Sequence, residues 1–382
     1  MRGQWRILLV VAASFLSAGS FWMFLPLLSM SLKSQGVSDA HAGLIAGLPW
    51  AGQLGVSFFI PGLIRRVGLQ RMVLAGLALA FCVYAGFAAS RSVMLWSGLC
   101  VVLGVSLALR WAGMDTWVNG AVPEAARGRL IGLYEFILSG SMAVGPGMLA
   151  LSGSSGRLPF LAACGVVLVA ILALVVAGRE RGHPAEAPAV ALHPWTLLKT
   201  APAPFIGIAL VGLTEACNLS LLPLFGLGEG EGEHVAALLV VLVQAGVAIG
   251  AALGGVLADK HDRRALQLAT AAMMVVLPLA VPVLFGRGAA WPEMFGWGLA
   301  QGALFTVGMV KLGAKFPADA LAAAMSLAMV VYTVGGIVGP PLLGTVMTIG
   351  GPAGLIYGLC VIAALGLVAI WRLGAAYYAP AK

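Results

Sequence analysis

The stretch Gly255-Val256-Leu257-Ala258-Asp259-Lys260-His261-Asp262-Arg263-Arg264 holds the densest cluster of charge in a chain that is otherwise strongly apolar. Five of its last six residues carry a formal charge, and long apolar runs lie on both sides of it. A charged side chain in the middle of a bilayer costs several kcal/mol. The sequence therefore predicts a short aqueous loop between two membrane-spanning helices.

The composition also places the chain in a membrane. Hydrophobic residues make up 61% of the 382 residues and charged residues only 9%, against roughly 25% charged residues in soluble domains. A helix needs about 20 apolar residues to cross the hydrocarbon layer. The sequence therefore predicts an all-α integral membrane protein with twelve transmembrane helices, at about residues 7–31, 41–63, 72–90, 93–118, 129–151, 158–177, 203–226, 235–257, 266–286, 290–314, 321–347 and 352–373.

A hydrophilic segment divides these runs into two sets of six. It has four prolines, two histidines and charges of both signs. We predict a six-helix bundle at residues 1–177, a cytosolic linker at 178–202 and a second six-helix bundle at 203–382.

The net charge of +8 follows from how lysine and arginine are distributed over the loops. They concentrate in alternate loops, on the side of the N-terminus, as expected for cytosolic loops. This pattern predicts a multi-pass protein of a bacterial-type inner membrane with both termini in the cytosol. The orientation of the chain in the lipid bilayer therefore explains the basic net charge, and no nucleic-acid partner is needed to explain it. The opposite loops hold few basic residues and an acidic run, namely Lys33, Arg91, Arg157, Arg287, Glu229, Glu231 and Glu233.

A weaker copy of the charged loop occurs at Pro61-Gly62-Leu63-Ile64-Arg65-Arg66-Val67-Gly68-Leu69-Gln70-Arg71. It aligns Arg65 with Asp259, 194 positions later, which is about half of the chain. The same offset relates Pro123 to Pro317, and Gly145-Pro146 to Gly339-Pro340. The sequence therefore predicts that one unit of six helices occurs twice.

The spelling Gly255-x-Leu257-Ala258-Asp259-Lys260-x-x-Arg263-Arg264 resembles the signature loop of the major facilitator superfamily, and the repeat extends the resemblance over the whole chain. The resemblance implies two pseudo-symmetric bundles that transport a small molecule by alternating access, and we expect a monomer. It also implies a cytosolic gate at Asp259, Arg263, Arg264, Arg65 and Arg66. Because Arg65 stands where the family has an acid, the gate is expected to depend mainly on the second half.

Two further motifs bear on the branch of this superfamily. Gly132-x8-Ser141-x3-Gly145-Pro146 looks like the glycine-proline signature of superfamily antiporters, with Ser141 in place of a glycine, and Gly339-Pro340 repeats part of it. Glycines allow close helix contact and proline bends a helix, which suits a moving interface. The segment Asp115-Thr116-Trp117-Val118-Asn119 is faintly similar to the branch that holds bacterial copper and riboflavin carriers.

Polar residues inside the predicted spans are the candidate functional residues, since the bilayer makes them costly. Arg110 and Glu135 lie at similar depth on the fourth and fifth runs. One hypothesis pairs them as a buried ion pair. In the other, Arg110 faces a central cavity, where it contacts an anionic substrate or helps to transfer a proton, with Asp115 and Glu135 as its partners.

Glu215 lies near the middle of the seventh run, which has no basic residue. Burial disfavours a charged carboxylate, so Glu215 is our candidate for proton coupling, and the alternative is a protonated acid that bonds neighbouring helices. Asn218 lies on the same helix face. The family resemblance implies that the first, fourth, seventh and tenth helices line the cavity, which adds Gln301, Ser17, Ser20 and Phe24 as lining candidates.

Other chemistry finds little support in the sequence. It contains no phosphate-binding loop and no Ser-His-Asp or metal-protease arrangement, so we expect no enzyme and no cofactor. Met325 and Met329 lie one turn apart and suit copper(I), but methionine is also common filler in apolar helices, and we assign no metal site.

These observations favour a proton-coupled secondary transporter of a small organic solute. The antiporter-like motif and an expected apolar cavity slightly favour export. The alternative is proton-coupled uptake of a small metabolite, vitamin or metal. A hypothesis from another class is a membrane assembly factor that does not transport, which predicts that Arg110 and Glu215 are fully paired inside the protein.

Overall fold

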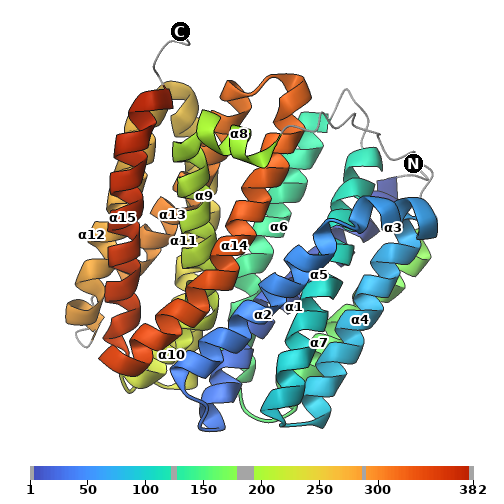
Figure 1. Ribbon diagram of the computed structural model, residues 1–382. Coiled ribbons are helices and arrows are strands. Elements are labelled where there is room, and N and C mark those ends of the chain that lie inside the picture. Colours follow the sequence, from blue (N-terminus) through green and yellow to red (C-terminus); the bar gives the residue numbers. More distant parts are fainter. Residues whose placement is uncertain (1–3, 122–126, 179–192, 286–289, 378–382) are drawn as a thin grey trace.

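The computed structural model describes residues 4–121, 127–178, 193–285 and 290–377, and this part of the chain is almost entirely helical (Figure 1). The long helices run roughly alongside one another. Their bounds, with those of the short segments between them, are α1 Gln4–Ser34, α2 Asp39–Ser57, α3 Ile60–Val67, α4 Leu69–Ala89, α5 Val93–Ala121, α6 Arg127–Ser152, α7 Leu158–Ala177, α8 Pro194–Thr200, α9 Pro202–Ser220, α10 Leu222–Gly228, α11 Glu233–Lys260, α12 Arg263–Leu284, α13 Trp291–Lys315, α14 Ala318–Gly350 and α15 Ala353–Tyr377.

Each of the twelve predicted runs corresponds to one helix or to one broken pair of helices. Among the described residues, nine helices are long and apolar enough to span a bilayer, and the pair α2–α3 makes a tenth. This pair bends by 62°, where Pro61 lies in the first turn of α3. The seventh run is broken in the same way, with Pro223 in the first turn of α10. Proline cannot donate the backbone hydrogen bond that would continue a helix, so both breaks follow from local sequence. The α6 and α13 helices complete the set.

The predicted charged loop is a sharp turn between α11 and α12. Asp262 caps the second helix, because its carboxylate accepts a hydrogen bond of 2.8 Å from the Ala265 N–H. Such a cap satisfies a backbone donor that the first turn of a helix leaves free. Asp259 and Lys260 are exposed in the last turn of α11. Two of the charges in the signature loop therefore stay in water while Asp262 fixes the geometry of the turn.

Helix packing repeats between the two halves of the chain. In the first half, α1 packs on α6 and α7, α4 packs on α5 and α7, and α2 packs on α5. In the second half, α9 packs on α14 and α15, α12 on α13 and α15, and α11 on α13. Each contact of the first set has its counterpart in the second, which confirms two pseudo-symmetric six-helix bundles. The exact division at 178–202 stays a prediction, since residues 179–192 lie outside the described part of the chain.

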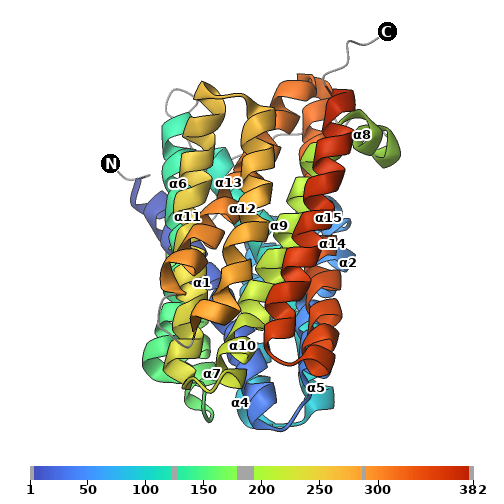
Figure 2. The ribbon, with the colours of Figure 1, turned by 90° about the vertical axis from the view of Figure 1, so that its left-hand side faces the viewer.

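The bundles contact each other mainly through two helix pairs, α2 with α14 and α6 with α11. Figure 1 shows α2 and α14 meeting toward its lower end, and Figure 2 shows α6 beside α11. The internal repeat converts one pair into the other, because α2 corresponds to α11 and α6 corresponds to α14.

We call the end of the molecule with the α1–α2 loop the lower end. The opposite end, with the α11–α12 loop, is the upper end.

Candidate functional site

Glu215 lies inside the second bundle, in contact with polar groups and away from the lipid-facing surface. Its side chain is 3% exposed, and its Oε2 accepts a hydrogen bond of 3.3 Å from Gln301 Nε2. Gln301 Oε1 in turn accepts a 3.0 Å bond from Asn218 Nδ2. Three residues singled out from the sequence therefore form one chain of hydrogen bonds between α9 and α13.

Further polar residues surround the same carboxyl group. Gln244 of α11 and Tyr332 of α14 approach Glu215, so four helices of the second bundle contribute to this cluster. Gln244 is fully buried, yet both of its amide atoms lack a hydrogen bond of normal geometry. Glu215 Oε1 and Asn218 Oδ1 also lack a partner among the described residues. An unpaired buried polar atom costs free energy, so this cluster has hydrogen-bonding capacity left for a proton, water or a ligand.

Aromatic rings connect this cluster to the first bundle. Trp50 of α2 packs edge-on against Tyr332, with ring centroids 6.0 Å apart. Its indole N–H has no hydrogen-bond partner in the part of the chain that is described. Tyr332 also packs against Phe305 at 5.8 Å. The Glu215 cluster thus lies next to the contact between the two bundles, where a solute bound between them would be found.

Arg110 forms a second buried polar centre, in the first bundle. It is 1% exposed, and its Nη1 donates to the Ser17 carbonyl at 2.6 Å and to the Ser17 hydroxyl. Tyr84 lies beside the guanidinium group, and its hydroxyl donates to Ser20 at 3.4 Å. The Nε and Nη2 atoms of Arg110 make no hydrogen bond of normal geometry among the described residues, although the Tyr84 hydroxyl interacts with the guanidinium group.

Arg110 lines a small pocket between α1, α5 and α6. The pocket has a volume of about 20 Å³, roughly the space of one water molecule. Its walls combine serines, apolar side chains and two aromatic rings, and are formed by Ser14, Ser17, Ala18, Leu107, Arg110, Trp111, Met114, Tyr134 and Leu138.

The acids proposed as partners of Arg110 are placed differently. Asp115 lies further along α5 and accepts a 2.7 Å hydrogen bond from Tyr134. The side chain of Glu135 lies outside the described residues, so the proposed pair with Arg110 stays a hypothesis. In the part of the chain that is described, Lys33 and Asp39 form an ion pair, and Arg110 forms none.

Ser17 and Ser20 lie at the Arg110 centre, but Phe24 does not. Phe24 is fully buried within the first bundle. Its ring packs against Phe87 at 4.9 Å and against Tyr84 at 5.6 Å. Phe24 therefore belongs to an aromatic core, and is absent from the walls of the Arg110 pocket.

The residues predicted to form a cytosolic gate lie at the upper end. Arg65 and Arg66 are exposed at the end of α3, and Asp259 is exposed at the end of α11. Arg263 bonds within its own turn, donating to the Ala258 carbonyl at 3.2 Å. The structure records no ion pair between Asp259 and any arginine of the described residues, so a closed gate at this end stays a prediction.

The glycine-proline motifs lie at close contacts of backbones. A Cβ atom at Gly145 would approach the Gly19 carbonyl oxygen to 2.6 Å, so this glycine packs α6 tightly on α1. Gly339 packs α14 on α9 in the same way, with the Leu213 carbonyl at 2.9 Å. Both glycines therefore serve contacts within a bundle. Pro340 contributes to the contact between bundles, since its carbonyl faces Gly43 of α2.

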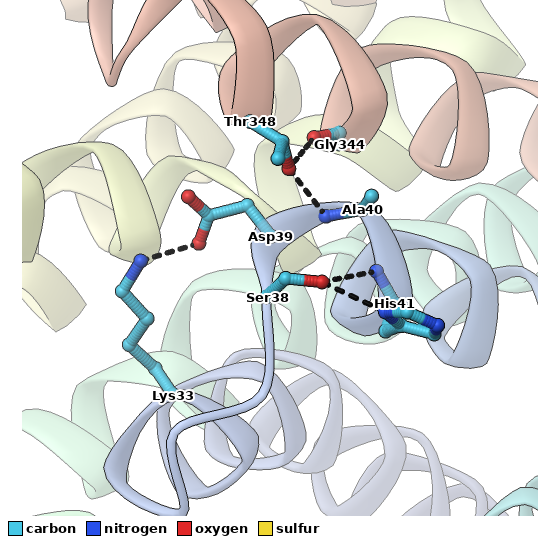
Figure 3. A network of polar contacts seen from close by, with 7 residues as sticks. All are labelled: Lys33, Ser38, Asp39, Ala40, His41, Gly344 and Thr348. Carbon is cyan, nitrogen blue, oxygen red and sulfur yellow. Dashed lines mark hydrogen bonds and ion pairs between the residues drawn. The ribbon is translucent and has the colours of Figure 1, made fainter.

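At the lower end, polar bonds join the bundles (Figure 3). The Ala40 N–H of α2 donates to Thr348 of α14 at 2.9 Å. Thr348 donates in turn to the Gly344 carbonyl. Asp39, the residue before Ala40, forms an ion pair with Lys33 at 2.6 Å. Gly344 leaves room for the chain here, because a Cβ atom would come within 2.4 Å of the Asp39 carbonyl oxygen.

A second set of bonds at the lower end repeats the first. The Ser154 N–H, after α6, donates to Glu233 of α11 at 2.9 Å, and His234 Nδ1 lies 2.8 Å from the Ala150 carbonyl oxygen. Glu233 stands 194 positions after Asp39, and Thr348 stands 194 positions after Ser154. The internal repeat therefore places equivalent residues in both contacts between the bundles.

Sequence reasoning missed several residues of these centres. Trp50, Tyr84 and Tyr332 are aromatic residues inside apolar helices, where aromatic side chains are usually core residues. The available signal for Trp50 and Tyr332 is that each carries a polar atom that needs a partner when it is buried. Gln244 was visible as an amide within a span, but its position beside Glu215 depends on how α11 packs against α9.

The fold and these centres define a polytopic membrane transporter, in which two bundles enclose buried polar groups near their contact. Comparison with known proteins identifies its family. The model of the Major Facilitator Superfamily matches residues 10–292 and 204–381. The chain belongs to this superfamily.

Relatives and solved structures agree with this assignment. The chain is 26% identical over 374 residues to the uncharacterized MFS-type transporter YfkF of Bacillus subtilis, covering 96% of this chain and 93% of the relative. It is 24% identical over 344 residues to an uncharacterized MFS-type transporter of Yersinia pestis, with 89% and 88% covered.

Two solved transporters share the fold at low sequence identity. A point variant of the nucleoside transporter NupG superposes with a TM-score of 0.84 at 12% identity, covering 97% of this chain and 99% of that structure. A D-xylose-proton symporter superposes with a TM-score of 0.77 at 16% identity, with 97% and 98% covered.

Proposed function

We propose that this protein is a proton-coupled secondary transporter of a small organic solute, in which Glu215 carries the coupling proton. The observation that supports this proposal most directly concerns the Glu215 carboxyl group, which is 3% exposed and has one oxygen without a hydrogen bond of normal geometry among the described residues. It lies in a cluster of amides beside the contact between two bundles. A carboxyl group that is buried in one conformation and hydrated in another binds its proton with different affinity in each.

The distribution of charge supports an orientation. The basic loops lie at the upper end, so this end faces the cytosol of a bacterial-type inner membrane and both termini lie there. The lower end then faces the outside, where both α2–α14 and α6–α11 hold the bundles together. This geometry fits the inward-facing step of alternating access, with the chain acting as a monomer.

The two centres are polar, which favours a polar solute. This supports the alternative of proton-coupled uptake of a small metabolite over export of an amphipathic compound. The export hypothesis depended on an apolar cavity, whereas Arg110, Glu215, Asn218 and Gln244 all retain unpaired polar atoms among the described residues. The glycines of the antiporter-like motif serve packing within each bundle and do not indicate a direction. The name of the D-xylose-proton symporter supports symport of a solute with a proton as a function that this fold can perform.

The hypothesis of a non-transporting assembly factor receives less support. It predicts that Arg110 and Glu215 are fully paired, but both keep unpaired atoms among the described residues. Such atoms lower stability unless a ligand, water or proton uses them. A protein selected for assembly alone gains nothing from that cost.

The proposal is tested in proteoliposomes that contain the full chain and carry an imposed pH gradient. Glu215→Gln is expected to abolish gradient-driven accumulation of solute while solute exchange without a gradient continues, because glutamine cannot release a proton. The matched control is Glu229→Gln, which removes an exposed acid at the lower end. Equal gradient-driven accumulation by Glu215→Gln and the wild type would show that another group couples the proton.

A further inference from the structure

The surroundings of Arg110 indicate which charge a bound solute should have. A guanidinium group stays protonated in proteins, so Arg110 is a permanent cation. It is 1% exposed, and no carboxylate of the described residues lies within ion-pair distance of it. Burial of a charge without a counter-ion is costly. Its Nε and Nη2 atoms make no hydrogen bond of normal geometry with the described residues, and they are two neighbouring donors of the kind that bind a carboxylate in a bidentate manner.

Among the described residues, which exclude the side chain of Glu135, the groups that face Arg110 from the surrounding helices leave this role open. From α1 it meets the neutral hydroxyl groups of Ser14 and Ser17, and from α4 it meets the phenol of Tyr84. On α6, Tyr134 bonds to Asp115. The pocket beside Arg110 already admits a group of about the size of water, about 20 Å³. A carboxylate oxygen is of that size, so a carboxylate can approach the guanidinium group through this opening when the helices part slightly.

The two polar centres are linked by one helix. α1 supplies Ser17 to Arg110, and it also packs against α9, the helix that carries Glu215. Movement of one bundle relative to the other therefore changes the surroundings of both centres together. The charges of Arg110 and Glu215 therefore contribute together to the free energy of that movement.

The cost of burying a net charge limits which charge states of Arg110, Glu215 and the solute allow an easy conformational change. With Glu215 ionised and no solute, the pair of Arg110 and Glu215 is neutral. With Glu215 protonated and a solute of one negative charge at Arg110, the pair is again neutral. A neutral solute bound with a proton leaves one positive charge, and a dianion leaves one negative charge. Among solutes carried together with one proton, only the monoanion leaves the pair of Arg110 and Glu215 neutral in both the loaded and the empty protein, which avoids a net charge on this pair during each transition.

We infer that the solute is a small organic monocarboxylate that enters together with one proton, so that transport moves no net charge. This inference rests on the proposed function, because it takes Glu215 as the group that binds the proton. The carboxylate binds Arg110, and Glu215 takes up its proton on the outer side and releases it to the cytosol. No bond other than that to the transferred proton forms or breaks.

Binding is tested with purified full-length protein by thermal shift. The probes are acetate, lactate, pyruvate and benzoate, with lactamide as the neutral counterpart of lactate, succinate as a dianion and tetraphenylphosphonium as an organic cation. At least one monocarboxylate is expected to stabilise the protein, and its apparent affinity should fall at least 10-fold in Arg110→Gln and less in Arg110→Lys. Arg91→Gln, at an exposed arginine of the α4–α5 loop, is the matched control. The inference is overturned if no monocarboxylate stabilises the protein, or if lactamide, succinate or tetraphenylphosphonium does so better.

Net charge movement is tested by uptake of the stabilising monocarboxylate into proteoliposomes with a potassium diffusion potential set by valinomycin. The initial rate is expected to stay the same, within about 2-fold, for potentials of either sign and to rise with an inward proton gradient. A rate that follows the potential would overturn the inference while leaving transport established. If the rate ignores the potential but Glu215→Gln keeps full gradient-driven uptake, the proposed role of Glu215 fails while carboxylate recognition by Arg110 stands.

Discussion

Gln301 joins α9 to α13 through a single side chain. Its amide donates to Glu215 and accepts from Asn218, so its removal leaves two buried groups without these partners. Gln301→Met has a similar volume and tests this role. Each group left unpaired is expected to cost about 1–3 kcal/mol, so the thermal midpoint of the protein in detergent should fall by several degrees.

Gln70→Met is the matched control for this change. Gln70 lies on α4, is only half-buried and donates a long bond of 3.5 Å to Leu174. Its replacement should leave the thermal midpoint nearly unchanged, because water can replace a weak bond at a partly exposed site. Equal midpoints for the two variants would mean that the Gln301 bridge contributes no stability.

Sequence reasoning found the polar residues of these centres more readily than their partners. Glu215, Asn218 and Gln301 were visible because polar groups are rare in apolar helices, and the structure joins them by hydrogen bonds. Phe24 was assigned to the cavity because the family resemblance implies that the first helix lines it, but a resemblance of this kind does not reveal which neighbour each face of the helix meets. Tyr332 was missed for the same reason, since its contact with Glu215 depends on the packing of α14 against α9.

At the scale of elements, the contact between α2 and α14 depends on the absence of side chains. Gly344 allows the backbone of α14 to touch the start of α2, where a Cβ atom would meet the Asp39 carbonyl oxygen at 2.4 Å. Gly344→Leu should therefore separate the helices at the lower end. We expect solute exchange to fall at least 10-fold, because the lower end, which the proposed orientation places outside, can no longer close.

The control for this change lies six residues further along the same helix. A Cβ atom at Gly350 meets nothing within 4 Å, so Gly350→Leu gains similar helix propensity without a collision. Exchange rates in proteoliposomes compare the two variants at equal protein content. Unimpaired exchange by Gly344→Leu would show that close contact of α2 and α14 is not needed for transport.

The course of the helices was predictable because hydrophobic length and loop charge are local properties. All twelve runs correspond to helices or broken pairs. The bend between α2 and α3 went unpredicted, although Pro61 lies at the break. A hydropathy average cannot distinguish a straight span from one that bends by 62°. The pairing of helices follows from tertiary packing, and the internal repeat revealed only that it should occur twice.

The internal repeat gives the lower end of the molecule two equivalent contacts. Asp39 and Glu233 occupy matching positions in the repeat, as do Ser154 and Thr348. Each contact joins the start of one helix to the end of a helix in the other bundle. Under the proposed alternating access both bundles move as units, so the free energies of the two contacts should add in favour of the closed lower end.

This additivity can be tested by removing the two contacts separately and together. Thr348→Val removes the acceptor of the Ala40 N–H, and Glu233→Gln weakens the charged acceptor of the Ser154 N–H. A hydrogen bond of this kind contributes about 0.5–1.5 kcal/mol. Each single change should therefore open the outer side about 2- to 10-fold more often, and the double variant by about the product of the two factors.

The reporter is a cysteine at Gly147 in a Cys82→Ala background, labelled from outside by a membrane-impermeant maleimide. A Cβ atom at Gly147 meets Val241 of α11 at an ordinary contact distance of 3.9 Å, so the cysteine fits the closed contact and becomes reachable when α6 and α11 part. Thr345→Val is the control, because that hydroxyl bonds only to Pro341 of its own helix among the described residues. If labelling of the double variant is no faster than that of either single variant, the two contacts do not hold a common closure. In that case the α2–α14 and α6–α11 pairs open independently, which two rigid bundles cannot do.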